Sequence, residues 1–421
     1  MKVIPMLEQL RKLIRDRRGN AIMIAGAALP IMVGFAGLAT DTVQWVSWKR
    51  ELQRAADSAA FAGAYAKNAG DSVDSAITTD LDHNNHNKVA LLSGYPQTSY
   101  PTSADWTDGV KVELAVKKEL TFSSLFLDNP PIVKVSGTAA MVNDGEFCLV
   151  ALEKGTTSGI TVGGSASLNM GCGAISNSRS GTESVGTNGN AYFFGANPVA
   201  GVGGLPDTIK GATDLQPYHI PMKDPFAGTA TAKPPGTQCK TMAQNTYTTG
   251  GNGNNSQKHL KAGCYTNFSF GGQDNYQLDP GTYYLDSTSF SMTGNATVTG
   301  TGVTFVLTGS TPGSVSMNGN ALLNVSAPTA GQFAKMLFVQ AANATTDNNN
   351  TINGNNGSKF DGALYFPNGK VNFTGSSSAS TKCALVVAKK IDFSGNTDIQ
   401  NNTTGCTANQ KVSGKAIKLV A

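Results

Sequence analysis

The chain has 421 residues, a length that accommodates about two or three domains. Charged residues make up 14% of it and glycine occurs 48 times, which excludes a protein that is helical throughout. The net charge of +4 arises largely from the segment that ends at Gly19, and Arg179 is the only arginine after Arg54. This distribution argues against a nucleic-acid-binding protein.

An uncharged run, Ala21 to Ala39, directly follows a basic cluster that contains Arg17 and Arg18. A helix of this length spans about 28 Å, which matches the hydrocarbon core of a bilayer. Pro30 lies inside the run, but a membrane helix tolerates a proline whose freed backbone groups find local partners. We therefore predict a membrane anchor, with Arg17, Arg18, Ala21, Pro30 and Ala39 as its marker residues.

The charges around this run predict its orientation. Basic residues dominate before it, whereas Asp41 is the first charge after it. Because positive charge stays on the cytoplasmic side, we predict that residues 1–19 form a cytoplasmic basic segment at the inner membrane. Everything from Asp41 onward is then exported, to the periplasm or the cell exterior. The helical pattern continues beyond the apolar run, which predicts one long helix over residues 20–70.

The alternative to an anchor is a cleaved signal peptide. Gly37 and Ala39 are small residues at the spacing that a signal peptidase requires. The apolar run is longer, however, than the usual apolar region of about 7 to 15 residues in such peptides. A retained anchor is therefore the favoured interpretation.

The segment from Arg17 to Ala60 contains a set of ordered motifs. They are Arg17-Arg18-Gly19-Asn20-Ala21, Ala28-Leu29-Pro30, Gly37-Leu38-Ala39-Thr40-Asp41, Trp45 and the run from Leu52 to Ala60. In this segment the chain resembles TadG-like Flp pilus-assembly proteins. The resemblance implies a structural component of a Flp/Tad pilus-assembly machine that contributes to surface attachment. Its implied partners are the lipid bilayer and other Tad components in the inner membrane and periplasm.

Proteolytic processing is a point at which this sequence departs from related proteins. TadE-type pseudopilins are cleaved after the glycine that corresponds to Gly19 and carry a glutamate five positions later. Here that later position is Ile24. We therefore expect the anchor to be retained in the mature chain.

Residues 71–145 are predicted to form a small α+β region with a pilin-like order of elements. Alternating apolar residues indicate two strands, one over 110–116 and one over 133–141. His83 and His86 have a spacing that metal ligands use, but their neighbours indicate a solvated polar loop without a third ligand. No metal site is therefore predicted.

From residue 146 onward the sequence repeats. Segments beginning at Ile160, Phe290, Val315, Val371 and Ile391, and a looser sixth beginning at Val185, alternate apolar and variable residues and end in Gly followed by Asn or Ser. Their glycines recur at intervals of 25 (164 to 189), 25 (294 to 319) and 20 (375 to 395). Such units give short strands with glycine at the bends and asparagines that stack from coil to coil.

The predicted fold class is therefore mainly β, with residues 146–421 forming a right-handed parallel β-helix, a pectate-lyase-like solenoid. Two stretches interrupt the repeat and are predicted to be insertions. The first, at about 197–261, is rich in proline and is interpreted as a long loop or lid. The second, at about 343–358, is polar.

The six cysteines fall into three pairs of similar separation in the sequence. The separation is 24 for Cys148 and Cys172, 25 for Cys239 and Cys264, and 23 for Cys383 and Cys406. An exported chain meets an oxidising environment, and adjacent strands lie about 4.8 Å apart, within reach of a disulfide. We predict that each pair bonds locally, between adjacent coils. No Cys-x-x-Cys motif indicates zinc.

Parallel β-helices also host polysaccharide lyases and hydrolases, which need paired carboxylates or a calcium cluster beside a groove. The best such cluster consists of Asp361, Asp392, Lys389 and Lys390, and solvated turn residues explain it equally well. We therefore predict no catalytic residue, no cofactor and no metal. The alternatives are a membrane-tethered β-helix enzyme whose partner is a polysaccharide, and a surface adhesin.

Overall fold

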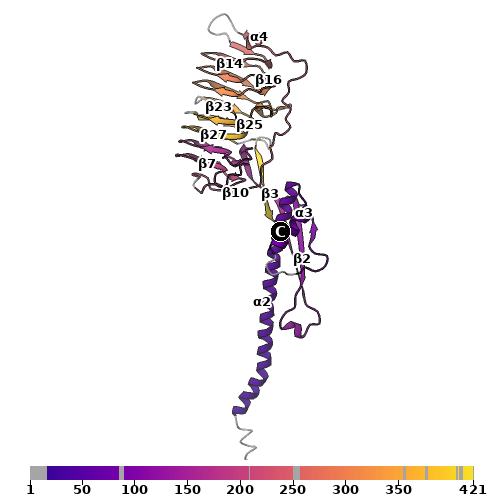
Figure 1. Ribbon diagram of the computed structural model, residues 1–421. Coiled ribbons are helices and arrows are strands. Elements are labelled where there is room, and N and C mark those ends of the chain that lie inside the picture. Colours follow the sequence, from indigo (N-terminus) through magenta and orange to yellow (C-terminus); the bar gives the residue numbers. More distant parts are fainter. Residues whose placement is uncertain are drawn as a thin grey trace, which may run out of the picture. The chain divides into compact units, whose positions relative to one another are not determined.

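The computed structural model describes residues 17–84, 90–207, 209–249, 257–353, 357–374, 378–403, 406 and 411–420 (Figure 1). The chain divides into two compact units, Met1–Val142 with Ile417–Ala421, and Asn143–Ala416. The second unit thus ends at residue 416, before the last five residues of the chain. The last residues join the first unit because the Val420 N–H donates a hydrogen bond to the Thr138 carbonyl at 2.9 Å.

The first unit is organised on one long helix. Its elements are α2 (Arg17–Ala69), α3 (Val73–Asn84), β1 (Gln97–Ser99), β2 (Thr107–Lys117), the 3-10 helix η1 (Ser123–Leu125), the first part of β3 (Ile132–Ala151) and the end of β29 (Val412–Leu419). In its second half α2 buries small residues, among them Ala56, Ala59 and Ala60. Small side chains let β3 approach closely, and a Cβ on Gly137 would lie 2.8 Å from the Ala56 carbonyl oxygen.

The two strands predicted in this region are present. β2 and β3 pair antiparallel, with Val112 opposite Gly137 and Val116 opposite Val133. The prediction of a solvated polar loop around His83 is wrong, because residues 73–84 form the helix α3, in which Ile77 is buried. His83 lies in the last turn of this helix, and His86 lies outside the described residues.

The second unit consists of short strands that fall in two sheets. One sheet contains the end of β3, β4 (Ile160–Val162), β6 (Gly173–Ser176), β7 (Val185–Thr187), β9 (Val199–Gly201), β10 (Leu215–Pro217), β13 (Gly263–Tyr265), β14 (Phe268–Phe270), β16 (Gly281–Asp286), β17 (Phe290–Met292), β19 (Val303–Thr308), β20 (Val315–Met317), β22 (Met336–Gln340), β23 (Asn348–Ile352), β25 (Ala363–Phe373) and β27 (Val386–Phe393). The other contains β5 (Ser167–Asn169), β8 (Tyr192–Phe194), β11 (Thr246–Thr249), β12 (Gln257–Leu260), β15 (Asn275–Leu278), β18 (Thr297–Thr301), β21 (Leu322–Ser326), β24 (Lys359–Asp361), β26 (Ser378–Lys382) and β28 (Asp398–Asn402). A short helix, α4 (Met242–Asn245), precedes β11.

The repeat strands pair in parallel, with equivalent residues of successive repeats in register. Phe270 pairs with Met292, which pairs with Met317. Phe373 pairs with Phe393 in the same way. Inward-facing aliphatic and aromatic side chains of these strands form one hydrophobic core. The protein is therefore mainly β, with an N-terminal apolar helix and a large, mostly parallel sheet that is consistent with a solenoid.

The coils do not stack in the order of the sequence. β27, the last of the repeat strands in this sheet, pairs in parallel with both β3 and β4, the first ones. Ile391 lies opposite Ile160, and Val386 lies opposite Leu149. The chain thus winds from β3 to β10 away from this junction, crosses the stack, and winds back from β13 to β27 (Figure 1).

Residues 218–239, which we call the strap, make this crossing, and they touch one coil after another. The strap contacts are Met222 with Asn177, Asp224 with Tyr365, Ala230 with Gln332, Lys233 with Asp286, and Cys239 with Cys264. Burial and the hydrogen bond to Asp224 raise the pKa of Tyr365, so this tyrosine stays neutral and its hydroxyl donates a hydrogen bond to the Asp224 carboxylate. The strap therefore ties the coils together along the stack.

Both predicted insertions are shorter in the structure. β9 and β10 lie inside the first one but continue the parallel stack, because Val199 and Ala200 are buried in register with β6. Inside the second one, β23 pairs with β20 and β25. Its Asn350 is fully buried, accepts a hydrogen bond from the Val315 N–H at 3.0 Å and donates to the Lys370 carbonyl at 3.2 Å. A polar stretch thus forms a coil because side-chain amides bond to backbone groups of the neighbouring coils.

Candidate functional site

The first half of α2 exposes a continuous apolar surface. Ile24, Phe35 and Leu38 are 63%, 70% and 54% exposed, and Leu29, Ile31, Met32 and Val33 are similar. Among the described helices, α2 is the one long and apolar enough to cross a membrane. The predicted marker residues Arg17, Arg18, Ala21, Pro30 and Ala39 all lie in this helix, which continues through the proline without a break. Apolar surface on this scale is unfavourable in water, so the helix suggests a single-pass membrane anchor.

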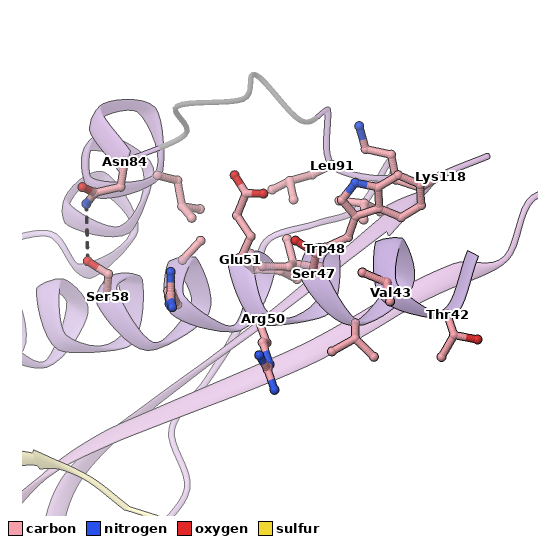
Figure 2. Close-up of a pocket in the computed structure, with 17 residues that line it drawn as sticks. Thr42, Val43, Ser47, Trp48, Arg50, Glu51, Ser58, Asn84, Leu91 and Lys118 are labelled. Carbon is pink, nitrogen blue, oxygen red and sulfur yellow. Dashed lines mark hydrogen bonds between the residues drawn. The ribbon is translucent and has the colours of Figure 1, made fainter. Parts of the chain in front are cut away.

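The second half of the same helix forms one wall of a groove in the first unit (Figure 2). The groove has a volume of about 960 Å³ and is completed by side chains of α3 and β2 and by Leu91 and Lys118. Trp48 lies against the Lys118 side chain, whose Nζ is 5.7 Å from the ring centroid. Asn84 donates a hydrogen bond to Ser58 at 3.3 Å and so joins α3 to α2 at one end of the groove.

The chemistry of this groove is that of an apolar binding surface. Aliphatic side chains from α2, α3 and β2 line it, and Arg50, Arg54 and Lys118 bring positive charge to it. Within the described part of its lining, Glu51 carries the one carboxylate, whereas catalysis by a carboxylate pair requires two. The groove is therefore suited to holding apolar groups rather than to acid–base chemistry. Local sequence patterns do not predict the groove, because its walls come from segments far apart in the chain.

Asp41 is the first charged residue after the apolar run and is 3% exposed. One carboxylate oxygen accepts the Phe122 N–H at 2.9 Å, and the other accepts both the N–H and the hydroxyl of Ser123 at 2.5 Å. Burial raises the pKa of Asp41, but the hydrogen bonds from Ser123 and Phe122 outweigh it and hold the pKa below the ordinary value. The carboxylate is thus ionised and fixes the residues around η1 to α2.

We expect this attachment to weaken in acid. Because the folded-state pKa lies below the ordinary 3.8, the stabilisation is complete above pH 3.8 and is lost as the pH falls through the lowered value. Hydrogen exchange of the Phe122 and Ser123 amides, corrected for intrinsic rates, should therefore accelerate only when the pH falls below 3.8. Asp41→Asn should show fast exchange already at pH 7, whereas the exposed Asp71→Asn should match the wild type. Equal protection in Asp41→Asn and the wild type would contradict this role.

The charged cluster predicted on the solenoid is only partly brought together. Lys389 and Lys390 both approach Asp347, at 3.1 and 3.7 Å, whereas Asp392 pairs with Lys370. Asp361 lies in β24, in the other sheet. Burial raises the pKa of Asp347, but the hydrogen bond and charge of Lys389 outweigh it and keep the pKa below its ordinary value. Asp347 is thus ionised, and Asp347 and Asp392 are each paired with lysines.

The three disulfides that the spacing predicts are present. Cys148 bonds to Cys172, Cys239 to Cys264 and Cys383 to Cys406, with Cα separations of 5.7, 4.4 and 5.4 Å. The described residues contain one group close enough to hold a metal ion, which is Cys239, Cys264 and Asp286. Its two cysteines are bonded to each other and Asp286 pairs with Lys233 at 2.7 Å, so this donor set does not suit a metal.

Comparison with known proteins gives one match, and it falls on α2. Residues 19–66 match the family described as Putative Flp pilus-assembly TadE/G-like. Neither a curated protein nor a solved structure matches the chain significantly. The matched segment contains the apolar run of α2 and the residues of its second half that line the groove. The N-terminal segment of this chain is therefore a Tad domain of the TadE/G-like Flp pilus-assembly type.

Proposed function

We propose that this protein is a structural component of Flp/Tad pilus assembly that is anchored in the inner membrane and contributes to surface attachment. The observation that carries the proposal is that one helix, α2, both matches the Tad family and exposes an apolar surface long enough to cross a bilayer. Its partners are then the bilayer and other Tad components in the inner membrane and periplasm. The cytoplasmic side holds residues 1–19, and the exported side holds the remainder from Asp41 onward.

We also propose that the second unit is a right-handed parallel β-helix of the pectate-lyase kind, which acts as a rigid exported body rather than as an enzyme. In support of rigidity, three disulfides and the strap join its coils. In support of a structural role, the carboxylates of Asp347 and Asp392 are each engaged by a lysine. A polysaccharide-active enzyme and an adhesin are the competing functions.

Deletion of this gene is expected to abolish or strongly reduce pili and surface attachment. Wild type should restore both, and so should Asp392→Asn and Lys389→Gln, because loss of a partly exposed ion pair costs about 1 kcal/mol. Asp361→Asn should restore both as well, because it leaves these two ion pairs intact. A matched negative control is Val33→Arg with Phe35→Arg, since each charge at the centre of a membrane helix costs about 2.5–3.5 kcal/mol. Pilus imaging and attachment assays measure the outcome.

Two results of this experiment would contradict the proposal. Normal pili in the deletion strain would rule out a role in assembly. Loss of function in a folded, membrane-bound Asp392→Asn or Lys389→Gln would indicate catalysis, because removal of a catalytic group lowers the rate by orders of magnitude.

The mature chain is expected to keep its anchor. Ile24 stands where pseudopilins carry glutamate, and the helix continues unbroken from Arg17 to Ala69. Intact-mass spectrometry of the protein extracted from membranes should therefore give the full-length chain. A chain that begins at Asn20 or at Thr40 would show processing instead.

A further inference from the structure

The loop between β2 and β3, residues 118–131, runs down α2 toward the apolar run. Lys118 lies over Trp48, Thr121 donates a hydrogen bond to Gln44 at 3.1 Å, and Ser123 bonds to Asp41. As the loop residue numbers rise, the numbers of their helix partners fall. The loop therefore descends along the helix (Figure 1). From residue 48 to residue 37 the helix axis covers about 16 Å.

The lowest contact of this loop lies inside the apolar run itself. The Phe122 ring packs directly on Gly37, where a Cβ would overlap the ring, so only glycine leaves room for it. Gly37 lies two residues before Ala39, the last residue of the run. Asp41 follows Ala39 by two residues and is the first charged residue after the run. The loop thus reaches the level at which the anchor leaves the membrane.

At this level the loop exposes three consecutive large apolar side chains. Leu125, Phe126 and Leu127 are 73%, 74% and 51% exposed. Phe126 packs on Phe122, with ring centroids 5.4 Å apart, so the exposed cluster is continuous with the ring that covers Gly37. Such a cluster is unfavourable in water and is typical of residues that enter the boundary region of a bilayer.

The backbone amides of the loop tip all donate hydrogen bonds within the protein, so none of them depends on water. The amides of Ser124, Leu125, Phe126 and Leu127 donate to carbonyls within the loop, at 2.9–3.1 Å. The Phe122 and Ser123 amides donate to the Asp41 carboxylate. Every backbone N–H from 122 to 127 is therefore paired, which lowers the desolvation cost of bringing these donors to the membrane boundary.

We propose that residues 122–127 insert into the leaflet of the membrane on the exported side, beside the anchor, and form a second membrane contact. The proposal rests on the membrane anchor of the proposed function. Lipid is the occupant that the structure favours, because the apolar cluster continues the apolar surface of α2 at the point where that helix leaves the bilayer. Two attachment points, linked through Asp41, would fix the tilt and rotation of the exported half of α2.

The test uses the full-length chain with one added cysteine that carries an environment-sensitive fluorophore, reconstituted in phosphatidylcholine–phosphatidylglycerol vesicles. The described cysteines are all in disulfides, so the added thiol is the one labelled. The loop positions are Phe126→Cys and Leu125→Cys, whose side chains are both more than 70% exposed, so that the substitutions disturb little packing beyond the contact of Phe126 with Phe122. Leu29→Cys reports on the anchor. Tyr100→Cys is the matched control, because Tyr100 is 52% exposed and lies beside Lys67, near the far end of α2.

The expected result is that phospholipids brominated near the headgroup quench most of the emission at both loop positions and leave the probe at position 100 unquenched. Lipids brominated deep in the acyl chain should quench position 29. If position 29 is quenched and the loop positions are not, the loop contact is overturned while the anchor stands. A blue-shifted loop probe that lipid does not quench would assign the cluster to a second copy or a partner protein and also overturn the proposal. An unquenched position 29 would overturn the anchor itself.

Discussion

Replacing Phe305 with alanine is expected to lower the free energy of unfolding of the second unit by about 3–5 kcal/mol. Phe305 is fully buried in the middle of the stack. Its ring packs against those of Phe290, Phe338, Tyr283 and Phe268, with centroids 4.9 to 5.9 Å away. These rings come from several neighbouring coils, so the cavity left by alanine would weaken contacts between coils as well as within one.

Hydrogen-exchange mass spectrometry and urea denaturation of the detergent-solubilised chain measure this effect. Protection should fall in β16, β19 and β22, which bring the rings together. Tyr192→Ala serves as control, because Tyr192 is 45% exposed and its loss should cost less than about 1 kcal/mol. Equal losses from the two variants would show that the aromatic stack is not a principal stabilising element.

The substitution Gly164→Ala is expected to destabilise the second unit by about 2–4 kcal/mol, which combines backbone strain with a steric overlap. Gly164 has a φ of +70°, and a Cβ there would lie 2.8 Å from the carbonyl oxygen of Gly395 on the neighbouring coil. The next coil repeats the arrangement, since a Cβ on Gly189 would lie 2.7 Å from the Gly164 carbonyl oxygen. Only glycine fits because the bends of successive coils stack directly on one another.

Gly164 lies at the junction where the last coil meets the first, so the damage should appear there. The Ser165 N–H donates to the Gly395 carbonyl at 2.9 Å, and we expect this amide to lose protection together with β4 and β27. Gly181→Ala is the matched control, because its φ is not positive and a Cβ there meets nothing within 4 Å. Its unfolding free energy should change by no more than about 1 kcal/mol. Wild-type protection in Gly164→Ala would refute the stacking of these bends.

Some features that bear on function could be predicted from sequence because they are local. The length of the apolar run and the motifs beside it pointed to an anchor of the Tad type, and the family match over residues 19–66 confirms the resemblance. The groove and the descending loop could not be predicted in this way. Each depends on side chains, such as Lys118 and Phe122, that only the antiparallel pairing of β2 and β3 brings alongside α2.

By itself the sequence determined that coils of about 20 to 25 residues would stack, because glycine and the apolar alternation recur at that interval. The order of stacking was decided only by the tertiary structure. Each repeat presents the same pattern of hydrogen-bonding edges, so a strand such as β27 can pair with any equivalent edge, and the period does not distinguish β3 from another neighbour. The strap determines which of these pairings forms. It bonds to Asn177 at one end of the crossing and to Cys264 at the other, so the remaining coils start across the stack and wind back toward β3. Likewise, the polar stretch around Asn350 forms a buried coil because the Asn350 side-chain amide bonds to the Val315 N–H on one neighbouring coil and to the Lys370 carbonyl on the other. Only the stacked arrangement brings these two partners to it.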